Sequence, residues 1–445
     1  MRTLVFMLAL CATAAQAMDG DIDPSFGTAG YIVQAPADAS LAPYGVTIQE
    51  DGKVLATGTR WAWNDPEGWQ DQAAVWRFLA DGTPDLSFGI GGLSLVSMGA
   101  GVMPTPTTII AQADGRIVIA GNLGGFGAVR LHADGSLDTD FGNNGVVHVD
   151  CANADPGQGL AAAIAIDAQG RLLLAGSGDV DPGPAMRSVG IVVRLLPDGA
   201  VDAEFGVGGC VTVSPADTNA TATAGLRSVA IDAADRVYVA GRGDLDGVQG
   251  LLAARIDATG SLDAGFGIGG ITFVANTATV DMRGSGALLA NGRWMLGGVC
   301  NSQSPMVAAC VLALDEHGVP DNGFGNQGWS SIALAGSVLP LNSLACQSDS
   351  KCMLLTTARP DAGPYRQFVV TRFTASGLPD PAFGVSGQAH IEVPTERDGS
   401  HIIARALALQ SGRPILLGTT DGVPSVNAFF ATRLQADLIF SDTLD

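Results

Sequence analysis

The chain has 445 residues and a formal net charge of −21, with 44 acidic residues against 23 basic ones. A surface this acidic repels phosphate backbones and anionic lipid headgroups, which argues against nucleic-acid binding and simple membrane-surface binding. Sixty glycines and an aromatic content of only 6% are typical of short strands joined by tight turns.

The first 17 residues have the features of a secretory signal peptide. Arg2 supplies a positive start, residues 4–12 form an apolar core too short to span a bilayer, and residues 15–17 read Ala-Gln-Ala, a small-x-small cleavage site. Cys11 suggests a lipoprotein instead, but it follows Leu10, where lipid attachment favours a small residue. We therefore predict cleavage after Ala17 and a mature protein that is secreted or periplasmic, monomeric and not inserted in a membrane.

One sequence motif, G-x-x-D-x-x-F-G-x-x-G, occurs seven times between residues 20 and 387, at intervals of 53 to 64 residues. A period near 60 residues indicates a repeat architecture. We expect a single domain over residues 18–434 and a short tail over residues 435–445. The repeated phenylalanines are Phe26, Phe88, Phe141, Phe205, Phe266, Phe324 and Phe383, and the repeated aspartates are Asp23, Asp85, Asp138, Asp202, Asp263, Asp321 and Asp380.

Each repeat contains four short apolar runs separated by turn residues. A first run follows the motif, and a second leads through a Gly-containing turn into a third, after which a fourth returns to the next motif. Asp51-Gly52 and Asn291-Gly292 are typical of two-residue hairpin turns in which both central residues have positive φ. Seven units of four antiparallel strands predict an all-β fold, a seven-bladed β-propeller.

The two ends of the chain are expected to share one blade. If the run after each motif is the outermost strand of the preceding blade, residues 30–35 complete the last blade beside residues 402–434. This closure of the ring by the N-terminal strand removes exposed sheet edges. The alternative is an open stack of the same units, which would leave two terminal edges.

The repeated residues have expected structural roles. The Phe is predicted to be a wedge between adjacent blades, and the Asp to accept hydrogen bonds from backbone amides of its own turn. An Arg stands eleven residues before the Phe at Arg77, Arg130, Arg194, Arg255 and Arg372, with Ala313 as the exception and Arg433 after the last copy. These arginines either line the central channel or pair with the repeated aspartates. We favour pairing, because an unpaired buried charge is unfavourable.

The motif, the D-G-[KR]-[IV]-[LVI]-x-[AT]-G hairpin and the Val-x-Arg strand together resemble the delta-60 repeat family. The resemblance covers nearly the whole mature chain and implies an exported seven-bladed propeller, but no particular activity. The sixth unit departs from the pattern, because residues 350–357 lack both hairpin glycines.

Six cysteines follow the predicted cleavage site, and an exported protein can form disulfides. Cys300 and Cys310 flank a loop between two apolar runs, and Cys346 and Cys352 bracket a five-residue turn, so we expect each pair to staple a hairpin. Cys151 and Cys210 remain, and we expect them to link neighbouring units. No CxxC motif or His-Cys cluster indicates a zinc site.

The most unusual loop runs from Thr59 to Gln72 and contains Trp61, Trp63 and Trp69. Indoles beside polar side chains suit stacking on sugar rings or contact with a protein partner. The alternative is that these rings fold back over the blade edge as a hydrophobic cap. Alternation of strand direction places this loop on the rim opposite the Gly-rich turns.

Other candidate sites are weaker. The acidic clusters Asp19/Asp21/Asp23, Asp179/Asp181 and Asp244/Asp246 lack the spacing of a calcium loop, so we expect no cofactor, with calcium as the alternative. The five histidines are scattered, and no HExxH, GxSxG or phosphate-loop motif is present. We therefore expect a non-enzymatic scaffold that binds a protein or glycan at its variable rim. The alternatives are a hydrolase, lyase or lactonase with a site at the central channel, and a purely structural envelope component.

Overall fold

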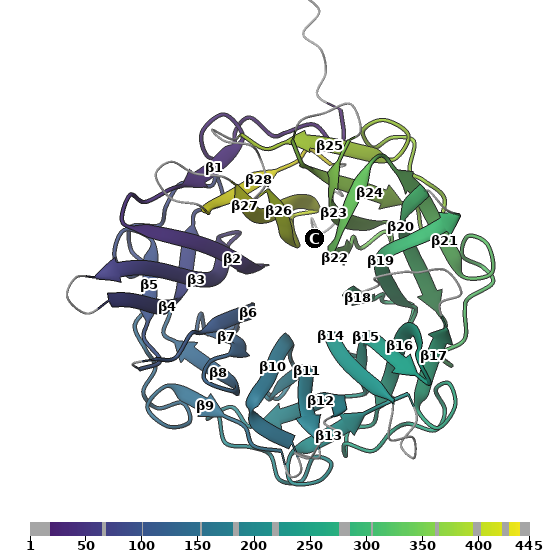
Figure 1. Ribbon diagram of the computed structural model, residues 1–445, viewed down its shortest axis with the longest axis horizontal. Helices are drawn as coiled ribbons and strands as arrows, with labels where there is room; N and C mark the ends of the chain where they lie inside the picture. Colours follow the sequence, from purple (N-terminus) through teal and green to yellow (C-terminus); the bar gives the residue numbers. More distant parts are fainter. Residues whose placement is uncertain are drawn as a thin grey trace, which may run out of the picture.

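Seven four-stranded antiparallel sheets are arranged around an axis, as the repeat predicts (Figure 1). The computed structural model describes residues 18–64, 68–99, 101–151, 154–180, 187–215, 222–275, 285–303, 306–360, 365–394, 402–420 and 427–436. The predicted signal peptide and residues 437–445 of the predicted tail lie outside these ranges. No helix in the described ranges is long and apolar enough to cross a membrane.

In each blade the strands follow one another from the channel outward. The first blade is β2 (Ala39–Ile48), β3 (Val54–Asn64), β4 (Gly68–Phe78) and β5 (Leu93–Val96), and the second is β6 (Thr105–Ala111), β7 (Ile117–Asn122), β8 (Phe126–Leu131) and β9 (Val146–His148). The third is β10 (Ala154–Ile166), β11 (Leu172–Val180), β12 (Arg187–Leu195) and β13 (Cys210–Val213), and the fourth is β14 (Thr223–Ile231), β15 (Val237–Leu245), β16 (Val248–Ile256) and β17 (Ile271–Ala275). The fifth is β18 (Ser285–Leu288), β19 (Trp294–Gln303), β20 (Met306–Leu314) and β21 (Trp329–Leu334), and the sixth is β22 (Ser337–Cys346), β23 (Cys352–Arg359), β24 (Gln367–Phe373) and β25 (Gln388–Glu392).

The seventh blade joins the two ends of the chain. It consists of β26 (Ile403–Gln410), β27 (Arg413–Thr420), β28 (Ala428–Arg433) and, on its outer edge, β1 (Tyr31–Gln34). Tyr31 pairs with Thr432 in this antiparallel ladder, and the Thr432 hydroxyl donates a hydrogen bond of 2.7 Å to the Gly30 carbonyl. The predicted closure of the ring is therefore confirmed, and the open stack is excluded.

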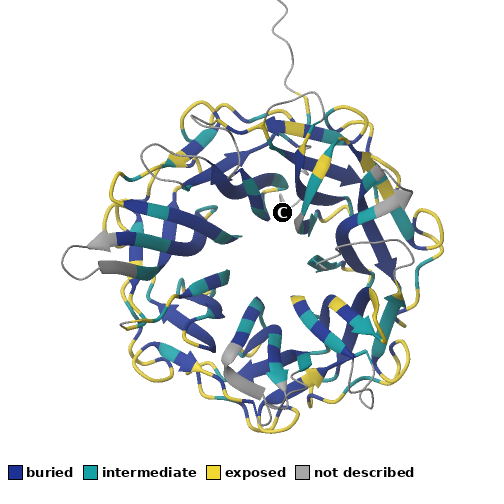
Figure 2. Ribbon diagram, in the orientation of Figure 1, coloured by how far each residue is buried: buried dark blue, intermediate teal, exposed yellow. Residues whose placement is uncertain are grey.

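The hydrophobic core is divided into seven clusters, one between each pair of neighbouring blades. Each cluster contains one motif phenylalanine, and all seven of these side chains are at most 1% exposed. Figure 2 shows buried residues along the packed faces of the blades and exposed residues in the peripheral loops. A Cβ at Gly135 would lie 2.8 Å from the Phe88 ring, so a motif glycine makes room for the preceding motif's wedge.

Each motif arginine joins three parts of the ring, as Arg130 illustrates. Its Nε lies 2.7 Å from an oxygen of Asp138, its guanidinium carbon lies 4.4 Å from the centre of the Phe141 ring, and Nη1 donates to the Pro197 carbonyl of the next unit. Burial by itself would raise the pKa of Asp138. The hydrogen bond from Arg130 and its positive charge lower this pKa by more than burial raises it, so the pKa lies below its usual value. The arginines therefore pair with aspartates, and they do not line the channel.

The fifth blade replaces its missing arginine from another strand. Ala313 stands where the other units have Arg, and Arg293, from the hairpin before β19, donates from Nε to Asp321 at 2.7 Å. Its guanidinium carbon lies 5.8 Å from the centre of the Phe324 ring. Arg293 also donates from Nη1 to the Ala375 carbonyl at 3.0 Å, so it makes all three contacts of the absent motif arginine.

The Asp-Gly hairpins differ from the prediction. Gly52 donates to the Gln49 carbonyl and Gln49 donates to the Lys53 carbonyl, both at 2.9 Å, so the loop has three central residues. Gly52 has a φ of +81°, whereas Asp51 is not among the positive-φ residues. This geometry is a turn followed by a left-handed Gly, in which only the Gly needs positive φ. Both central residues have positive φ at Ser411-Gly412 of the seventh blade.

The structure contains the three expected disulfides. Cys300–Cys310 links β19 to β20, Cys346–Cys352 closes the hairpin between β22 and β23, and Cys151–Cys210 joins the end of the second blade to β13 of the third. Three disulfides in one chain are typical of an oxidising compartment, extracellular or periplasmic.

Candidate functional site

The inner strand of a blade carries a one-residue β-bulge at an equivalent position in at least five blades. The pairing of β2 with β3 passes from Pro43 directly to Gly45 and leaves Tyr44 unpaired. The same shift isolates Thr107, Ala162, Arg227 and Arg405 in β6, β10, β14 and β26. A bulge leaves its extra residue outside the ladder and re-aims the side chain.

A glycine opposite the bulge permits this arrangement. A Cβ added at Gly58 would collide with the carbonyl oxygen of Ala42, and the equivalent Gly121 would collide with Thr105 in the same way. These are the glycines that end the repeated hairpin signature. They are needed because the bulged backbone approaches β3 and β7 too closely for any side chain.

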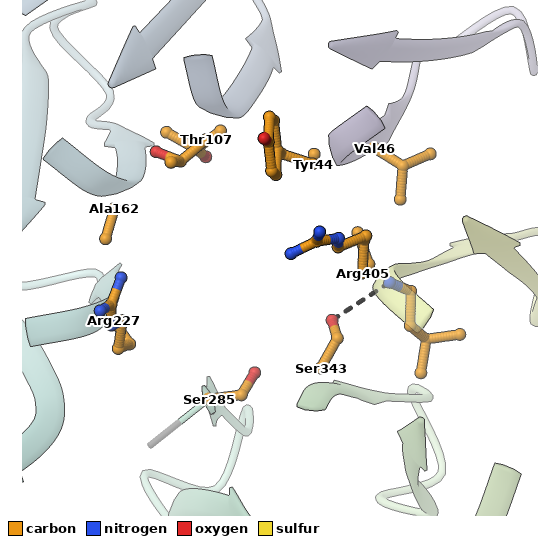
Figure 3. Close-up of a pocket in the computed structure, with 12 residues that line it drawn as sticks. Tyr44, Val46, Thr107, Ala162, Arg227, Ser285, Ser343 and Arg405 are labelled. Atoms are coloured by element: carbon orange, nitrogen blue, oxygen red, sulfur yellow. Dashed lines mark hydrogen bonds between the residues drawn. The ribbon is translucent and has the colours of Figure 1, made fainter. Parts of the chain in front are cut away.

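The bulge residues surround a cavity of about 370 Å³ in the central channel (Figure 3). Its lining comes from the inner strands of all seven blades, which Figure 1 shows around the central opening. The repeated framework is nearly identical from blade to blade, but the residues facing this cavity are not. They are Tyr44, Gly45, Val46, Thr107, Thr108, Ala162, Arg227, Ser285, Ser343, Arg405, Ala406 and Leu407.

Arg405 and Tyr44 form a contact at one side of the cavity. The guanidinium carbon of Arg405 lies 5.0 Å from the centre of the Tyr44 ring, within cation–π range. Burial lowers the pKa of Arg405, and the electrostatic interaction with Tyr44 opposes that shift only in part. Burial likewise raises the pKa of Tyr44, with Arg405 opposing. The pair is therefore partly buried, and Tyr44 keeps its proton at neutral pH.

Hydroxyl side chains in the cavity join neighbouring inner strands. Ser343 Oγ accepts a hydrogen bond of 3.1 Å from the Leu407 amide, drawn in Figure 3, and Ser285 Oγ accepts one of 2.8 Å from the Leu344 amide. Thr107 donates its hydroxyl to the Ala161 carbonyl of the next blade. These bonds fix the positions of the polar groups that line the channel.

A second cavity, of about 160 Å³, lies between the third and fourth blades and shares Arg227 with the first. Arg242 and the hydroxyl residues Ser177, Ser188 and Thr223 also line it. Arg227 is exposed and projects from β14 into the channel in Figure 3. The two cavities therefore lie side by side on either side of one cationic side chain.

The predicted tryptophan loop is a long hairpin made of β3 and β4. Trp63 pairs with Trp69 in its register, and Trp61 pairs with Asp71. Trp61 is half-buried, whereas residues 65–67 and the side chains of Trp63 and Trp69 lie outside the described part of the structure. Trp61 is not among the described residues that line either cavity, so we treat the hairpin and the channel as separate candidate surfaces.

Members of two of the three acidic clusters have structural partners. Asp23 accepts from Arg433 and Ser25, Asp19 accepts from Arg372, and Asp244 accepts from the Gly247 amide. Among the described residues, no group of three His, Cys, Asp or Glu side chains is placed to hold a metal ion. Asp181 lies outside the described ranges.

Sequence reasoning missed Tyr44, Arg227 and Arg405. They stand eight, eight and seven residues before the turn residues Gly52, Asp235 and Gly412, so repeat alignment brings them together. The signal was available as the position where aligned units differ most in chemistry: Tyr, Thr, Ala, Arg and Arg in five units. What the sequence lacked was the strand register that shows this position to be a bulge facing the channel.

Comparison with known proteins agrees with this fold. Residues 49–88, 112–141, 170–205 and 234–266 match a family model described as a domain of unknown function (DUF5122) beta-propeller. Every matched segment ends on a motif phenylalanine, so the chain carries the repeat of a β-propeller family. No curated protein matches the sequence.

Solved structures with similar folds have little sequence in common with this chain. The polysaccharide lyase Uly1 is 11% identical with a TM-score of 0.50, over 92% of this chain and 99% of its own. Virginiamycin B lyase from Staphylococcus aureus is 10% identical with a TM-score of 0.43, over 91% of this chain and 100% of its own. The β-propeller domain of the trilobed protease from Pyrococcus furiosus is 8% identical with a TM-score of 0.45, over 92% and 99%. At these identities the similarity concerns the fold alone.

Proposed function

We propose that this protein is an exported, non-enzymatic β-propeller of the delta-60 repeat type that binds a glycan or protein ligand. The observation that carries the proposal is the contrast between framework and channel. Motif Phe, Asp and Arg side chains are fully used in packing and ion pairs, whereas the bulge residues differ from blade to blade. Positions that break the symmetry of a repeat protein are where a single ligand site can form.

The binding face is proposed to be the rim that carries the hairpin of β3 and β4. Gln410 donates to the carbonyls of Gly52 and Ala80, at 2.6 and 3.1 Å, so the Gly-rich hairpins and the motifs share the opposite rim. Because strands alternate in direction, the connections between the second and third strands of each blade, such as that between β3 and β4, open on the other side. Trp61, Trp63 and Trp69 belong to that side, where aromatic rings can contact a sugar or a protein surface.

An elimination or hydrolysis reaction at the channel is the second candidate, and the Tyr44–Arg405 contact is the observation that favours it. Solved propellers of similar fold include polysaccharide lyases. A tyrosine general base, however, needs a pKa lowered toward the working pH. Burial raises the pKa of Tyr44 instead. The cavity lining also contains no carboxylate or imidazole in the described chain, so a binding role is the better account.

The test uses the mature protein on an array of neutral and acidic glycans and in capture of exported proteins. Simultaneous substitution of Trp61, Trp63 and Trp69 by Ala should abolish binding of neutral glycans and of protein ligands and leave the melting temperature nearly unchanged. Ile268→Ala, on the opposite rim and 92% exposed, is the matched control and should bind normally. Loss of folding in the triple variant would support the cap interpretation. Turnover of a polysaccharide or lactone by the wild type would favour the enzyme, and absence of any ligand would favour a structural envelope role.

A further inference from the structure

Arg405 is a cation without an anionic partner in a chain that has an excess of carboxylates. The protein contains 44 acidic and 23 basic residues, and the motif arginines all have aspartate partners in the described blades. For Arg405, no ion pair to a described carboxylate is formed, and its Nε is buried without a hydrogen-bond acceptor. A partly buried guanidinium without an anionic partner is unfavourable for folding.

From this arrangement we infer that the channel cavity binds a small anionic sugar, whose carboxylate or sulfate group is held by Arg405. The inference rests on the proposed binding function and names the ligand class for the channel. A carboxylate or sulfate accepts hydrogen bonds from a guanidinium in a bidentate geometry, which would satisfy the group that the protein leaves without a partner.

The remaining polar groups of the cavity favour an acceptor-rich ligand. Arginine has no acceptor atoms, so Arg405 and Arg227 can only donate. Ser285 and Ser343 already accept backbone amide protons through Oγ, and their own hydroxyl protons remain to be donated. A cation would find no carboxylate among the described residues that line this cavity. A hydroxylated anion matches both the arginines and the serine hydroxyls.

The size of the site and the charge of the protein limit the ligand. A volume of about 370 Å³ is at the lower end of the range for small-molecule sites, which is roughly 300–1,000 Å³. The adjoining cavity of about 160 Å³ shares Arg227 and has three hydroxyl side chains, so a second sugar unit can be accommodated there. The net charge of −21 opposes the approach of long polyanions, which favours a mono- or disaccharide.

The experiment is calorimetric titration of the mature protein with glucuronate, its neutral amide glucuronamide, a glucuronate disaccharide and inorganic sulfate. Loss of hydrogen bonds to a charged group is expected to weaken binding by roughly 10- to 100-fold. We expect that loss for glucuronamide on the wild type and for glucuronate on Arg405→Gln, with an intermediate loss for Arg405→Lys. Arg236→Gln is the control, because Arg236 pairs with Asp232 on the hairpin rim. It should bind like the wild type.

Melting temperatures separate a binding role from a structural one. Without ligand, Arg405→Gln should melt at or above the wild-type temperature, because it removes an uncompensated cation, whereas Arg130→Gln should melt lower. Sulfate that binds as well as glucuronate and depends on Arg405 supports an anion site without preference for carboxylate. The inference is overturned if neither anion binds, if both bind equally well to Arg405→Gln, or if Arg405→Gln unfolds at a markedly lower temperature. If the wild type still binds neutral glycans and the triple tryptophan variant does not, the proposed function stands even though the inference about Arg405 has failed.

Discussion

The wedge role of the motif phenylalanine can be tested within one motif by comparing Phe88→Ala with Ile90→Ala. Phe88 is 0% exposed and packs between the first two blades, whereas Ile90, two residues later, is 90% exposed. Phe88→Ala thus removes a large apolar side chain from the core, and Ile90→Ala removes one from the surface. Backbone effects of the motif are the same in both.

The expected loss of stability follows from burial and from the arginine contact. Truncation of a buried Phe to Ala costs about 3–5 kcal/mol through lost transfer free energy and a residual cavity. The Arg77 guanidinium carbon lies 4.5 Å from the centre of the Phe88 ring. Loss of that cation–π contact adds about 1 kcal/mol, for a total near 5 kcal/mol. Ile90→Ala should change the free energy of unfolding by no more than about 0.5 kcal/mol.

Calorimetry converts these energies into melting temperatures. At about 2.1 cal/mol/K per residue, roughly 420 residues give an unfolding entropy near 0.9 kcal/mol/K. Phe88→Ala should therefore melt about 6 °C below the wild type, and Ile90→Ala within about 1 °C of it. Equal melting temperatures for the two variants would refute the wedge. An early separate transition in Phe88→Ala would instead show that the first two blades unfold apart from the ring.

Three further predictions concern the links that hold the ring together. The Cys151–Cys210 disulfide closes a separation of 59 residues, and its removal should lower the free energy of unfolding by about 4 kcal/mol. Removal of Cys346–Cys352, with a separation of 6, should lower it by about 2 kcal/mol. Denaturant titration of the two double Cys-to-Ala variants should show this order. The pKa of Asp138 is lower in the folded state than in the unfolded state, so the ionised carboxylate stabilises the fold above the unfolded pKa of about 4, and this stabilisation is lost as the pH falls through the folded value. The difference in melting temperature between the wild type and Asp138→Asn should therefore persist at pH 7 and shrink below about pH 4. Deletion of residues 18–34 removes β1 and should produce aggregation visible by light scattering, because the edge of β28 is then unpaired; a monodisperse product of unchanged melting temperature would contradict the closure argument.

Local repetition made the scaffold predictable. Seven copies of one motif determined the number of blades, and the position of the first strand relative to the first motif determined how the ring closes. The roles of Phe88 and Asp138 followed from the motif itself, since a repeated aromatic needs a repeated packing site and a repeated carboxylate needs a repeated partner. The cysteine pairs followed from their places beside turns and from the one pair that remained.

Strand register decided what the motif could not. The hairpin at Asp51-Gly52 has a three-residue loop, in which only Gly52 takes the left-handed conformation. Likewise, only packing shows that Arg293 reaches the aspartate left without its usual partner by Ala313. Both features depend on how close neighbouring segments lie in the folded protein, and the repeat pattern of the sequence does not give that distance.

The candidate site depended most on tertiary structure. The sequence by itself determined a closed ring of seven similar sheets, because each unit repeats the same local packing and turn chemistry. It did not place Arg405, Arg227 and Tyr44 together, because they are separated by 178 to 361 residues and each stands in a different, mainly apolar strand. The bulge in each inner strand turns its extra residue out of the ladder, and closure of the ring brings those residues to one axis. Only that convergence makes a cationic cavity inside an acidic protein.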